Sequence, residues 1–260
     1  MMTAETDTDT PAWSDAELAS NPHDARDKAG RVRRMFDAIA GRYDLNNRLH
    51  SLGRDQAWRR RTARHAVQSR EDRVLDVACG TGDLTEAIAC LGPARAVGVD
   101  FSTGMLDVAI SKAKNRKRRP GATVPEYVHG DAMSLDFEDG SFDACTIAFG
   151  IRNVEDPPRA IREFHRILSP GGRCLVLEFS EPSNPVMRML NNLYSKRIMP
   201  VTATLVSGDR SGAYRYLPRS METFLTPREL CNVMEEAGFR DIHREPMTCG
   251  ICTLNVGVKA

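Results

Sequence analysis

A short glycine-containing segment joins two apolar runs in the first half of the chain, and an acidic residue follows it. The segment is Asp76-Val-Ala-Cys-Gly80-Thr81-Gly82, and Asp100 follows Gly82 by 18 residues, at the end of the next apolar run. Glycine adopts backbone angles closed to other residues and lets the main chain approach a ligand. A carboxylate at the end of the second run can accept hydrogen bonds from a ribose diol. The spacing therefore predicts a nucleoside site.

The residues around the second glycine argue against a phosphate-bearing ligand. A dinucleotide site requires a third glycine where this chain has Thr85, and the acidic Asp83 stands where a phosphate would approach. No Gly-Lys-Ser/Thr follows, which excludes a P-loop. The pattern D-x-x-C-G-T-G resembles the first motif of class I S-adenosylmethionine-dependent methyltransferases, whose cofactor carries no phosphate. Through this resemblance we expect Asp76, Gly80, Thr81, Gly82 and Asp100 to bind S-adenosyl-L-methionine.

A second acidic position lies one strand further along. Gly130-Asp131-Ala132 follows the third short apolar run. In methyltransferases of this class, a carboxylate and a neighbouring backbone N–H commonly read the adenine ring at this point. The resemblance therefore adds Asp131 and Ala132 to the expected cofactor site.

The elements that must position these residues alternate between two periodicities. Short apolar runs, each typical of a buried strand, alternate with amphipathic segments whose ends carry capping residues such as Ser102 and Asp156. The expected strands are 73–79, 95–100, 125–129, 142–149 and 174–179. This alternation predicts a doubly wound α/β fold with a parallel sheet covered on both faces. The methyltransferase resemblance implies a Rossmann-like, mostly parallel sheet of seven strands.

The domain organisation follows from composition. Residues 1–28 carry seven acidic and two basic residues without apolar periodicity, which predicts a disordered tail. No linker divides residues 29–260, so we expect one methyltransferase domain with an N-terminal helical cap. Within it, residues 185–225 are expected to form an insertion that covers the substrate, with Val186, Leu190 and Leu193 on one helical face; plain core packing is the alternative.

Two longer stretches resemble the signatures of one family. The first runs from Phe36 through Tyr43-Asp-Leu-Asn46-Asn47 to Arg59, and the second from Phe149-Gly-Ile-Arg152-Asn153 to Ser180. Both resemble the ubiquinone/menaquinone biosynthesis C-methyltransferase family, and the similarity runs from about residue 31 to the C-terminus. It implies methyl transfer from S-adenosylmethionine to a ring carbon of a polyprenylated quinol.

The resemblance and the chemistry together suggest catalytic residues. A quinol carbon becomes nucleophilic when a ring hydroxyl loses its proton, so the enzyme must favour a phenolate. Arg152 is expected to stabilise that oxygen and Asn153 to orient the ring, whereas a surface salt bridge from Arg152 to Glu155 or Asp156 is the alternative. Tyr43 is a candidate proton relay or cofactor lid. Family members often carry serine where this chain has Ala148, so Ala148 is not counted as a site residue.

Two other motifs have simpler interpretations. Asp156-Pro157-Pro158-Arg159 resembles an amino-methyltransferase box, but it ends in arginine and suits a helix cap with proline at the first position. Cys249 and Cys252 are expected in the last strand on opposite faces, where their thiols cannot meet. The six histidines show no ligand spacing, so no metal site is expected.

Composition limits the partners. Thirty-six Lys and Arg against 35 Asp and Glu give a net charge of +1, so no global field attracts nucleic acid. The basic runs 59–64 and 112–119 lack interleaved aromatics, which disfavours a nucleic-acid partner but leaves an anionic membrane surface open. Seven scattered cysteines and the lack of a signal peptide predict a cytoplasmic protein, with peripheral contact at the inner face of the membrane as an alternative. A homodimer also stays open.

The leading hypothesis is C-methylation of demethylmenaquinol to menaquinol. The benzoquinol precursor of ubiquinone is the nearest alternative, because the family shares one pattern for both. The segment from Tyr194 to Tyr216 looks more like menaquinone-producing members, which favours the naphthoquinol. An RNA base methyltransferase and a non-catalytic cofactor-binding scaffold are the remaining alternatives.

Overall fold

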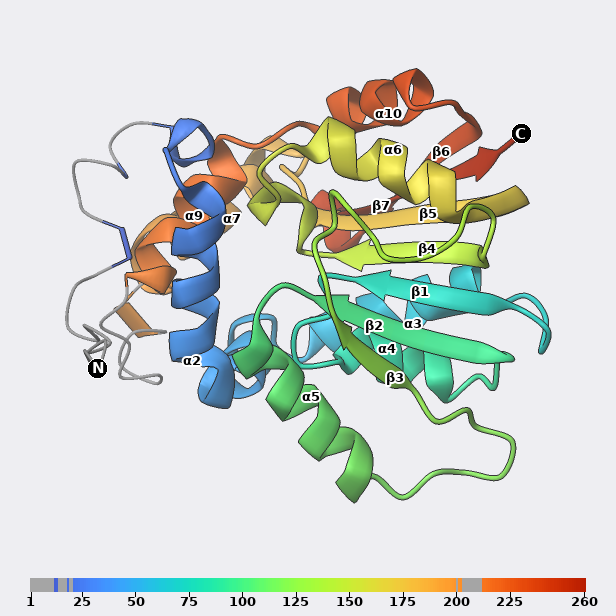
Figure 1. Ribbon diagram of the computed structural model, residues 1–260. Coiled ribbons are helices and arrows are strands. Elements are labelled where there is room, and N and C mark those ends of the chain that lie inside the picture. The colour runs from blue at the N-terminus through green and yellow to red at the C-terminus, as the bar shows by residue number, and fades with distance from the viewer. Residues whose placement is uncertain (1–11, 14–17, 19–20, 200, 203–211) are drawn as a thin grey trace, which may run out of the picture.

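The computed structural model describes residues 12–13, 18, 21–199, 201–202 and 212–260, which are built around one seven-stranded sheet (Figure 1). The strand order is β3-β2-β1-β4-β5-β7-β6. The first five strands in this order run parallel, and β7 is antiparallel to both of its neighbours. The strands are β1 (Arg73–Val77), β2 (Arg95–Asp100), β3 (Glu126–His129), β4 (Phe142–Ala148), β5 (Leu168–Phe179), β6 (Phe239–Met247) and β7 (Cys252–Lys259). The predicted doubly wound, mostly parallel sheet is confirmed.

Helices bury both faces of this sheet. On one face, α3 (Arg54–Ala66) and α4 (Asp83–Ala89) pack Trp58 and Leu84 against alternate strand residues such as Val74. On the other face, α6 (Pro157–Ile167) and α10 (Pro227–Glu236) cover Leu75 and Val77. Successive residues of β1 therefore point into two different cores, which explains why Val74, Leu75 and Val77 are all apolar. The helix α5 (Thr103–Asn115) packs on β3, β2 and the N-terminal helix.

Local sequence signals set the ends of two helices. The Ser102 hydroxyl accepts a hydrogen bond from the Met105 N–H at 3.0 Å, and the Asp156 carboxylate accepts one from the Arg159 N–H at 3.0 Å. Both predicted caps are confirmed, and Asp156-Pro157 starts a helix whose apolar face is fully buried. The strand after it begins earlier than predicted: β5 starts at Leu168, because that residue pairs with Phe142 across a bulge.

A long helix closes one end of the molecule. Figure 1 shows α2 (Lys28–His50) crossing the carboxyl ends of the parallel strands, beside α9 (Ala213–Glu222). Its buried residues Val32, Met35 and Ile39 share a core with Met105 of α5. This helix is the expected N-terminal cap.

The described part of residues 1–28 is packed against this cap, where the sequence suggested a disordered tail. Trp13 is fully buried and stacks on Tyr216 of α9, with ring centroids 4.6 Å apart. Pro22–Asp24 forms a short 3-10 helix, η1, capped by Asn21. The large apolar ring of Trp13 provides buried area that holds this part of the segment in place, and the mostly acidic composition gave no sign of it. Most of residues 1–20 lie outside the described residues, and for them the disordered tail stays a prediction.

The segment expected to cover the substrate contains α7 (Pro185–Leu193), the π-helix η3 (Tyr194–Ile198) and α9. Residues 200 and 203–211 of this segment lie outside the described residues. The helix α7 has no buried residue, whereas α9 buries Ala213 and Tyr216. Within the described ranges, no helix is both long enough and apolar enough to span a membrane.

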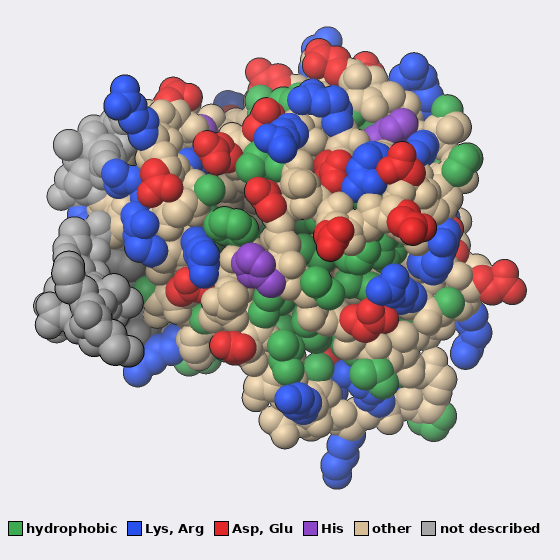
Figure 2. Space-filling view, in the orientation of Figure 1, with side chains coloured by type: hydrophobic (Ala, Val, Ile, Leu, Met, Phe, Trp, Pro, Cys, Tyr) green, Lys and Arg blue, Asp and Glu red, His purple; other side chains and the backbone are tan. Residues whose placement is uncertain are grey.

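The surface seen in Figure 2 mixes the two signs of charge. Lys and Arg side chains alternate with Asp and Glu over this face, and no single-sign patch dominates the view. The pattern agrees with the nearly neutral net charge of the chain. Because surface charge does not mark a functional region on this face, the site is identified from its local geometry.

Candidate functional site

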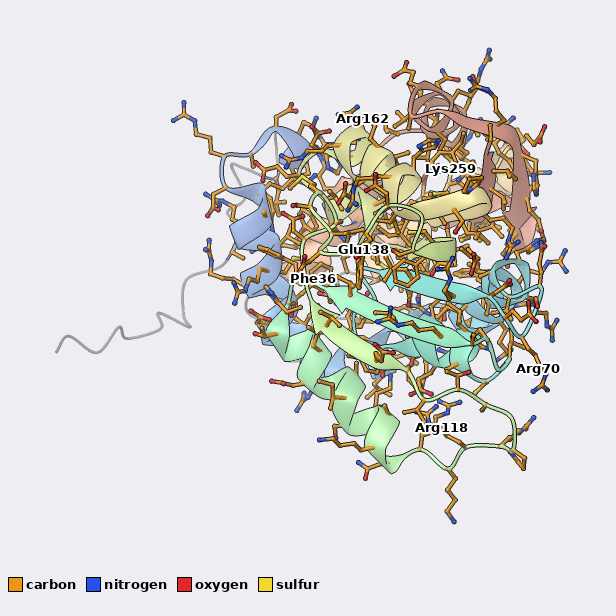
Figure 3. All side chains as sticks on the ribbon, turned by 45° about the vertical axis from the view of Figure 1, so that its right-hand side comes forward. Phe36, Arg70, Arg118, Glu138, Arg162 and Lys259 are labelled. Carbon is orange, nitrogen blue, oxygen red and sulfur yellow. The ribbon has the colours of Figure 1, made fainter. Side chains whose placement is uncertain are left out.

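A cavity opens where the carboxyl ends of β1, β2 and β4 meet α2. Phe36, labelled in Figure 3, and Tyr43 line it from the cap, and Met105 lines it from α5. The sheet side contributes residues that follow successive strands: Val77, Ala78, Gly80, Asp100, Phe101, Gly130, Asp131, Ala132, Met133, Ala148, Phe149, Gly150 and Asn153. Five of the predicted cofactor or catalytic positions on the sheet side therefore reach one cavity, and Tyr43 faces them from the cap.

The glycine turn presents bare backbone to this cavity. Gly80 has φ +56°, and a Cβ added there would meet no heavy atom within 4 Å. Gly82 has φ +81°, and a Cβ there would collide with the Tyr127 side chain. The turn therefore favours glycine for two reasons: both residues have left-handed backbone angles, and at Gly82 an aromatic residue also packs against the main chain.

Asp100 is held in place by the turn that it faces. Its carboxylate accepts hydrogen bonds from the Gly80 N–H at 2.7 Å and from the Ser102 N–H at 2.8 Å. Burial raises the pKa of Asp100, and the backbone donors oppose the shift. The two N–H groups fix the orientation of a carboxylate that still lines the cavity, which is what recognition of a ribose diol requires.

Asp76 has a different position from the one predicted for a cofactor ligand. It is 1% exposed beneath the turn and is not among the residues that line the cavity. Its two oxygens accept hydrogen bonds from the Thr85 hydroxyl at 2.6 Å and from the Thr146 hydroxyl at 2.8 Å. Burial raises the pKa of Asp76 to about 6. Asp76 thus joins β1, α4 and β4 below the turn and positions it.

Asp131 and Ala132 follow β3, the strand next to β2, and line the cavity close to Asp100. The Asp131 carboxylate accepts a hydrogen bond from the Met133 N–H at 2.9 Å, which closes a tight turn after β3. Both residues line the cavity, and Ala132 is buried. A carboxylate next to a backbone N–H can pair with the amino and ring-nitrogen edge of an adenine.

Thr81 points away from the cavity and attaches the cap to the turn. Its hydroxyl donates to Asp44 of α2 at 2.5 Å. The other Asp44 oxygen and Asp83 both accept from the Lys112 ammonium, at 2.6 and 2.5 Å. Asp44 was missed by sequence reasoning, although it directly follows Tyr43 in the first signature. Its position in that signature was the one hint of a role. The role itself could not be predicted, because its partner Thr81 lies 37 residues away in the sequence.

Arg152 is buried, where the alternative interpretation placed it on the surface. It lies in η2 (Ile151–Asn153), is 3% exposed, and donates from Nη1 to Glu178 Oε1 at 2.6 Å and to the Phe149 carbonyl at 2.8 Å. Burial raises the pKa of Glu178, and the Arg152 guanidinium opposes that shift. Among the described residues, Arg152 Nε and Glu178 Oε2 find no hydrogen-bond partner. The salt bridge to Glu155 or Asp156 is therefore replaced by a buried pair with Glu178.

Asn153 reaches the cavity between two aromatic residues. Its Oδ1 accepts from the Tyr216 hydroxyl at 3.0 Å, and its amide donates to the Phe149 carbonyl at 3.3 Å. Tyr43 lines the same cavity and packs edge-to-face on Phe36, with centroids 5.9 Å apart. Asn153 and Tyr43 are thus together at the cavity, whereas Arg152 lies behind its lining and pairs with Glu178.

Lys28 links the cap to the loop that carries Arg152. It is 2% exposed, and its ammonium donates to the Val154 carbonyl at 2.6 Å. Burial lowers the pKa of Lys28 to about 8. The neighbouring residues Ala29 and Val154 both line the cavity. Sequence reasoning missed Lys28 because its partner is 126 residues away.

Two residues that are not glycine adopt left-handed backbone angles at the ends of adjacent strands. Ala78 after β1 has φ +50°, and Phe149 after β4 has φ +59°. Both line the cavity. A Cβ on the adjoining Gly150 would lie 2.6 Å from the Ala78 Cβ, so the two turns touch. Backbone conformations of this kind cost about 1–3 kcal/mol each and concentrate at functional sites.

The arrangement fits a nucleoside-bearing cofactor. The carboxylates of Asp100 and Asp131 supply hydrogen-bond acceptors, and the open space at Gly80 leaves room for a ligand. Asp83, expected to repel a phosphate, is paired with Lys112 and does not line the cavity. Within the described residues, no group of three or more His, Cys, Asp or Glu could hold a metal ion. Cys249 lies in a short turn before β7, not in the strand as expected, and it is a free thiol like Cys252.

Known structures with the same fold are methyltransferases. The chain is similar to an S-adenosylmethionine-dependent methyltransferase of Thermotoga maritima, described as a possible histamine N-methyltransferase (TM-score 0.59, 18% identity, 88% of this chain and 100% of that one). It is also similar to a structure titled as a complex of the Haloferax volcanii Trm112 methyltransferase activator with a putative methyltransferase (TM-score 0.62, 19% identity, 87% and 96%). At these identities the likeness shows the class I methyltransferase fold.

Proteins with similar sequences share a higher identity with this chain than these structures do. A protein of Clavibacter sepedonicus named demethylmenaquinone methyltransferase is 42% identical over 91% of this chain and 93% of its own length. One of the same name from Thermus thermophilus is 44% identical, over 86% and 99%. A Geobacter protein named ubiquinone/menaquinone biosynthesis C-methyltransferase UbiE is 41% identical, over 90% and 98%. The pattern of the ubiE/COQ5 methyltransferase family matches residues 24–259. The chain therefore belongs to the ubiE/COQ5 methyltransferase family.

Proposed function

We propose that this protein transfers a methyl group from S-adenosylmethionine to a ring carbon of demethylmenaquinol, giving menaquinol. Family and fold imply S-adenosylmethionine as the methyl donor. The observation that carries the substrate is the name shared by relatives more than 40% identical over most of the chain. The cavity supports it, because cofactor acceptors on one wall face Asn153 and Tyr43 on the other.

The cofactor side of the cavity has one task, which is to orient a nucleoside. Asp100 would accept from the ribose hydroxyls, Asp131 and the Ala132 N–H would pair with the adenine, and Gly80 leaves room for the remainder. When bound, S-adenosylmethionine supplies a methyl group on a positively charged sulfur. Asp76 and Thr81 serve indirectly, since Asp76 supports the turn and Thr81 fixes the cap over it.

The substrate side must favour the ionised form of a ring hydroxyl. Once the hydroxyl proton leaves, the ring carbon forms its new bond to the methyl carbon while the sulfur–carbon bond breaks, and the carbon then loses its hydrogen to restore the aromatic ring. Arg152 and Lys28 are two buried cations behind this wall, and Glu178 is the buried carboxylate that partners Arg152. Glu155 and Asp24 lie near the Lys28 ammonium, so the group that we propose favours an anionic oxygen is the Arg152 guanidinium. Asn153 would orient the ring, and Tyr43 would relay the proton.

The benzoquinol precursor of ubiquinone is the second candidate. It is favoured by the Geobacter relative, whose name covers both quinone pathways. The cavity residues do not separate a one-ring from a two-ring substrate. The test must therefore offer both.

The experiment is mass spectrometry of quinols after incubation of the full chain with S-adenosylmethionine. Demethylmenaquinone and the demethylated ubiquinone precursor are offered in parallel, each reduced and oxidised, with an RNA arm beside them. We expect one added methyl on reduced demethylmenaquinol only, because only the quinol has a proton to lose. Cofactor binding without transfer to either quinol would overturn the assignment, and methylation of the RNA would replace it.

Arg152→Ala separates an enzyme from a cofactor-binding scaffold. We expect kcat to fall far more than cofactor affinity, because Arg152 lies on the substrate side and not at the glycine turn. A scaffold predicts no transfer by the natural chain and hence nothing for the substitution to remove. If cofactor affinity fell and kcat did not, Arg152 would belong to the cofactor site instead.

A further inference from the structure

The helix α7 and the following η3 turn their apolar side chains outward. Val186, Met189, Leu190 and Leu193 recur at helical spacing, yet all four are at least half exposed, and α7 buries no residue. An amphipathic helix in a globular protein normally faces its apolar side to the core. A contiguous apolar helix face left in water indicates a surface that binds something.

The end of α2 adds a second exposed apolar element beside the first. Leu45, Leu49 and Leu52 are 60%, 49% and 87% exposed. The Tyr194 hydroxyl of η3 joins the two elements, since it donates to the His50 carbonyl at 3.1 Å and lies 2.9 Å from His50 Nδ1. We call these exposed side chains the apolar end face: Leu45, Leu49, Leu52, Val186, Met189, Leu190, Leu193 and Ile198.

The segments that carry these side chains contain basic but no acidic residues, and the acidic partners of Arg48 and Arg188, Asp83 at 3.8 Å and Glu181 at 3.9 Å, lie outside them. Residues 185–198 contain three basic residues and no acidic one, and residues 48–54 contain Arg48 and Arg54, again with no acidic residue. This differs from the face in Figure 2, where the two signs alternate. Apolar side chains beside Lys and Arg are the composition of helices that lie in the surface of an anionic bilayer.

The apolar end face shares a helix with the cavity. Phe36 and Tyr43 line the cavity from α2, and Leu49 follows Tyr43 by six residues on the same helix, a rise of about 9 Å. The face is therefore close to the cavity along the axis of α2. A polyprenyl tail needs an apolar surface close to the cavity, because it cannot be left in water.

We propose that the apolar end face docks on the surface of an anionic lipid bilayer, so that the quinol ring enters the cavity while its tail stays in lipid. This inference rests on the proposed function for the identity of the tail. The leucines and methionine would enter the region between headgroups and acyl chains, and the arginines would contact lipid phosphates. No spanning helix is required for this mode of contact.

The test is flotation of the full chain with phosphatidylcholine vesicles, with and without one third phosphatidylglycerol. The natural chain should float with the anionic vesicles, and L190D/L193D should weaken that binding by about tenfold or more, because two carboxylates would enter the interface. The controls are the single variant Leu190→Asp and Val124→Asp, which introduce one carboxylate each; Val124 is 70% exposed and precedes β3, outside the apolar end face. We expect Leu190→Asp to weaken flotation. Val124→Asp should leave flotation within about twofold of the natural chain.

Two further measurements keep the outcomes distinct. Activity on a demethylated quinol without a tail should be equal in L190D/L193D and the natural chain, whereas activity on vesicle-embedded substrate should fall. If the natural chain binds no vesicles and L190D/L193D converts a dimer into a monomer by size, the face is a subunit interface and the proposal is wrong. If no quinol is methylated by any variant but anionic vesicles are still bound, the proposed function fails and the docking surface stands.

Discussion

The two walls of the cavity are built in different ways. Beside the cofactor site, both oxygens of each buried aspartate have donors: Asp100 accepts from the Gly80 and Ser102 N–H groups, and Asp76 accepts from the Thr85 and Thr146 hydroxyls. Beside the substrate site, Arg152 pairs with Glu178, but Arg152 Nε and Glu178 Oε2 have no partner among the described residues. The aspartates of the first wall are therefore fully bonded before any ligand arrives. The second leaves hydrogen-bonding capacity beside the position we assign to the substrate.

The sequence could foresee residues that belong to a local pattern, but not the partners that the fold brings to them. Asp76, Gly80, Gly82 and Asp100 were found because the glycine turn, the strand before it and the strand after it are local patterns. The roles of Glu178, Lys28 and Asp44 were missed because each acts through a partner 26 to 126 residues away. Periodicity and capping foresaw most strands and the helix at Asp156. Periodicity and capping do not tell which buried charged side chains will pair with each other.

The largest effect should come from breaking the buried ion pair. Glu178→Ala leaves the Arg152 guanidinium buried without its carboxylate, and we expect a loss of about 3–5 kcal/mol in the free energy of unfolding. Urea unfolding measures it, with the Arg152→Ala and double variants completing a cycle. The control Glu126→Ala breaks an exposed pair with Arg95 and should cost under about 1 kcal/mol. Equal losses in the two variants would remove the contrast between buried and surface pairs.

Next in size is the ribose contact on the cofactor wall. Asp100→Ala should weaken binding of S-adenosylmethionine by roughly 1.5–3 kcal/mol, because charge-assisted hydrogen bonds are lost. Isothermal titration calorimetry measures the affinity, with Asp107→Ala on the exposed side of α5 as control. Unchanged affinity in Asp100→Ala would show that the ribose lies elsewhere.

Lys28 gives the substrate wall a stability that rises with pH, whereas burial raises the pKa of Cys79 and of Tyr127 at the cofactor turn, which acts in the opposite direction at alkaline pH. The folded pKa of Lys28, about 8, lies below the unfolded value of 10.5, so between these values the unfolded chain binds more protons and stability rises with pH. From pH 7.5 to pH 10 this contributes about 2 kcal/mol, which Lys28→Met should remove. Urea unfolding at both pH values measures the difference between the two proteins. If the free energy of unfolding changed with pH equally in Lys28→Met and in the natural chain, the lowered pKa of Lys28 would be contradicted. The other titratable groups near the ammonium are His23, Asp24 and Glu155.

The smallest effect concerns one hydroxyl on each wall. Tyr216→Phe removes the donor to Asn153 and should cost about 1 kcal/mol of stability while keeping the stacking on Trp13. Tyr127→Phe is the matched control, because the Tyr127 hydroxyl is buried without a partner among the described residues. Its removal should change stability by less than about 0.5 kcal/mol. A larger loss from Tyr127→Phe than from Tyr216→Phe would reverse the comparison.

The contact between the two left-handed turns limits how this site can evolve. Ala78 and Gly150 follow neighbouring strands, and a Cβ on the second would overlap the Cβ of the first. A side chain at position 150 is therefore acceptable only if position 78 gives way, for example by becoming glycine. Gly150→Ala alone is expected to be lost by selection, whereas Gly150→Ala together with Ala78→Gly can survive. At this point the floor of the cavity changes shape most easily through two coordinated mutations.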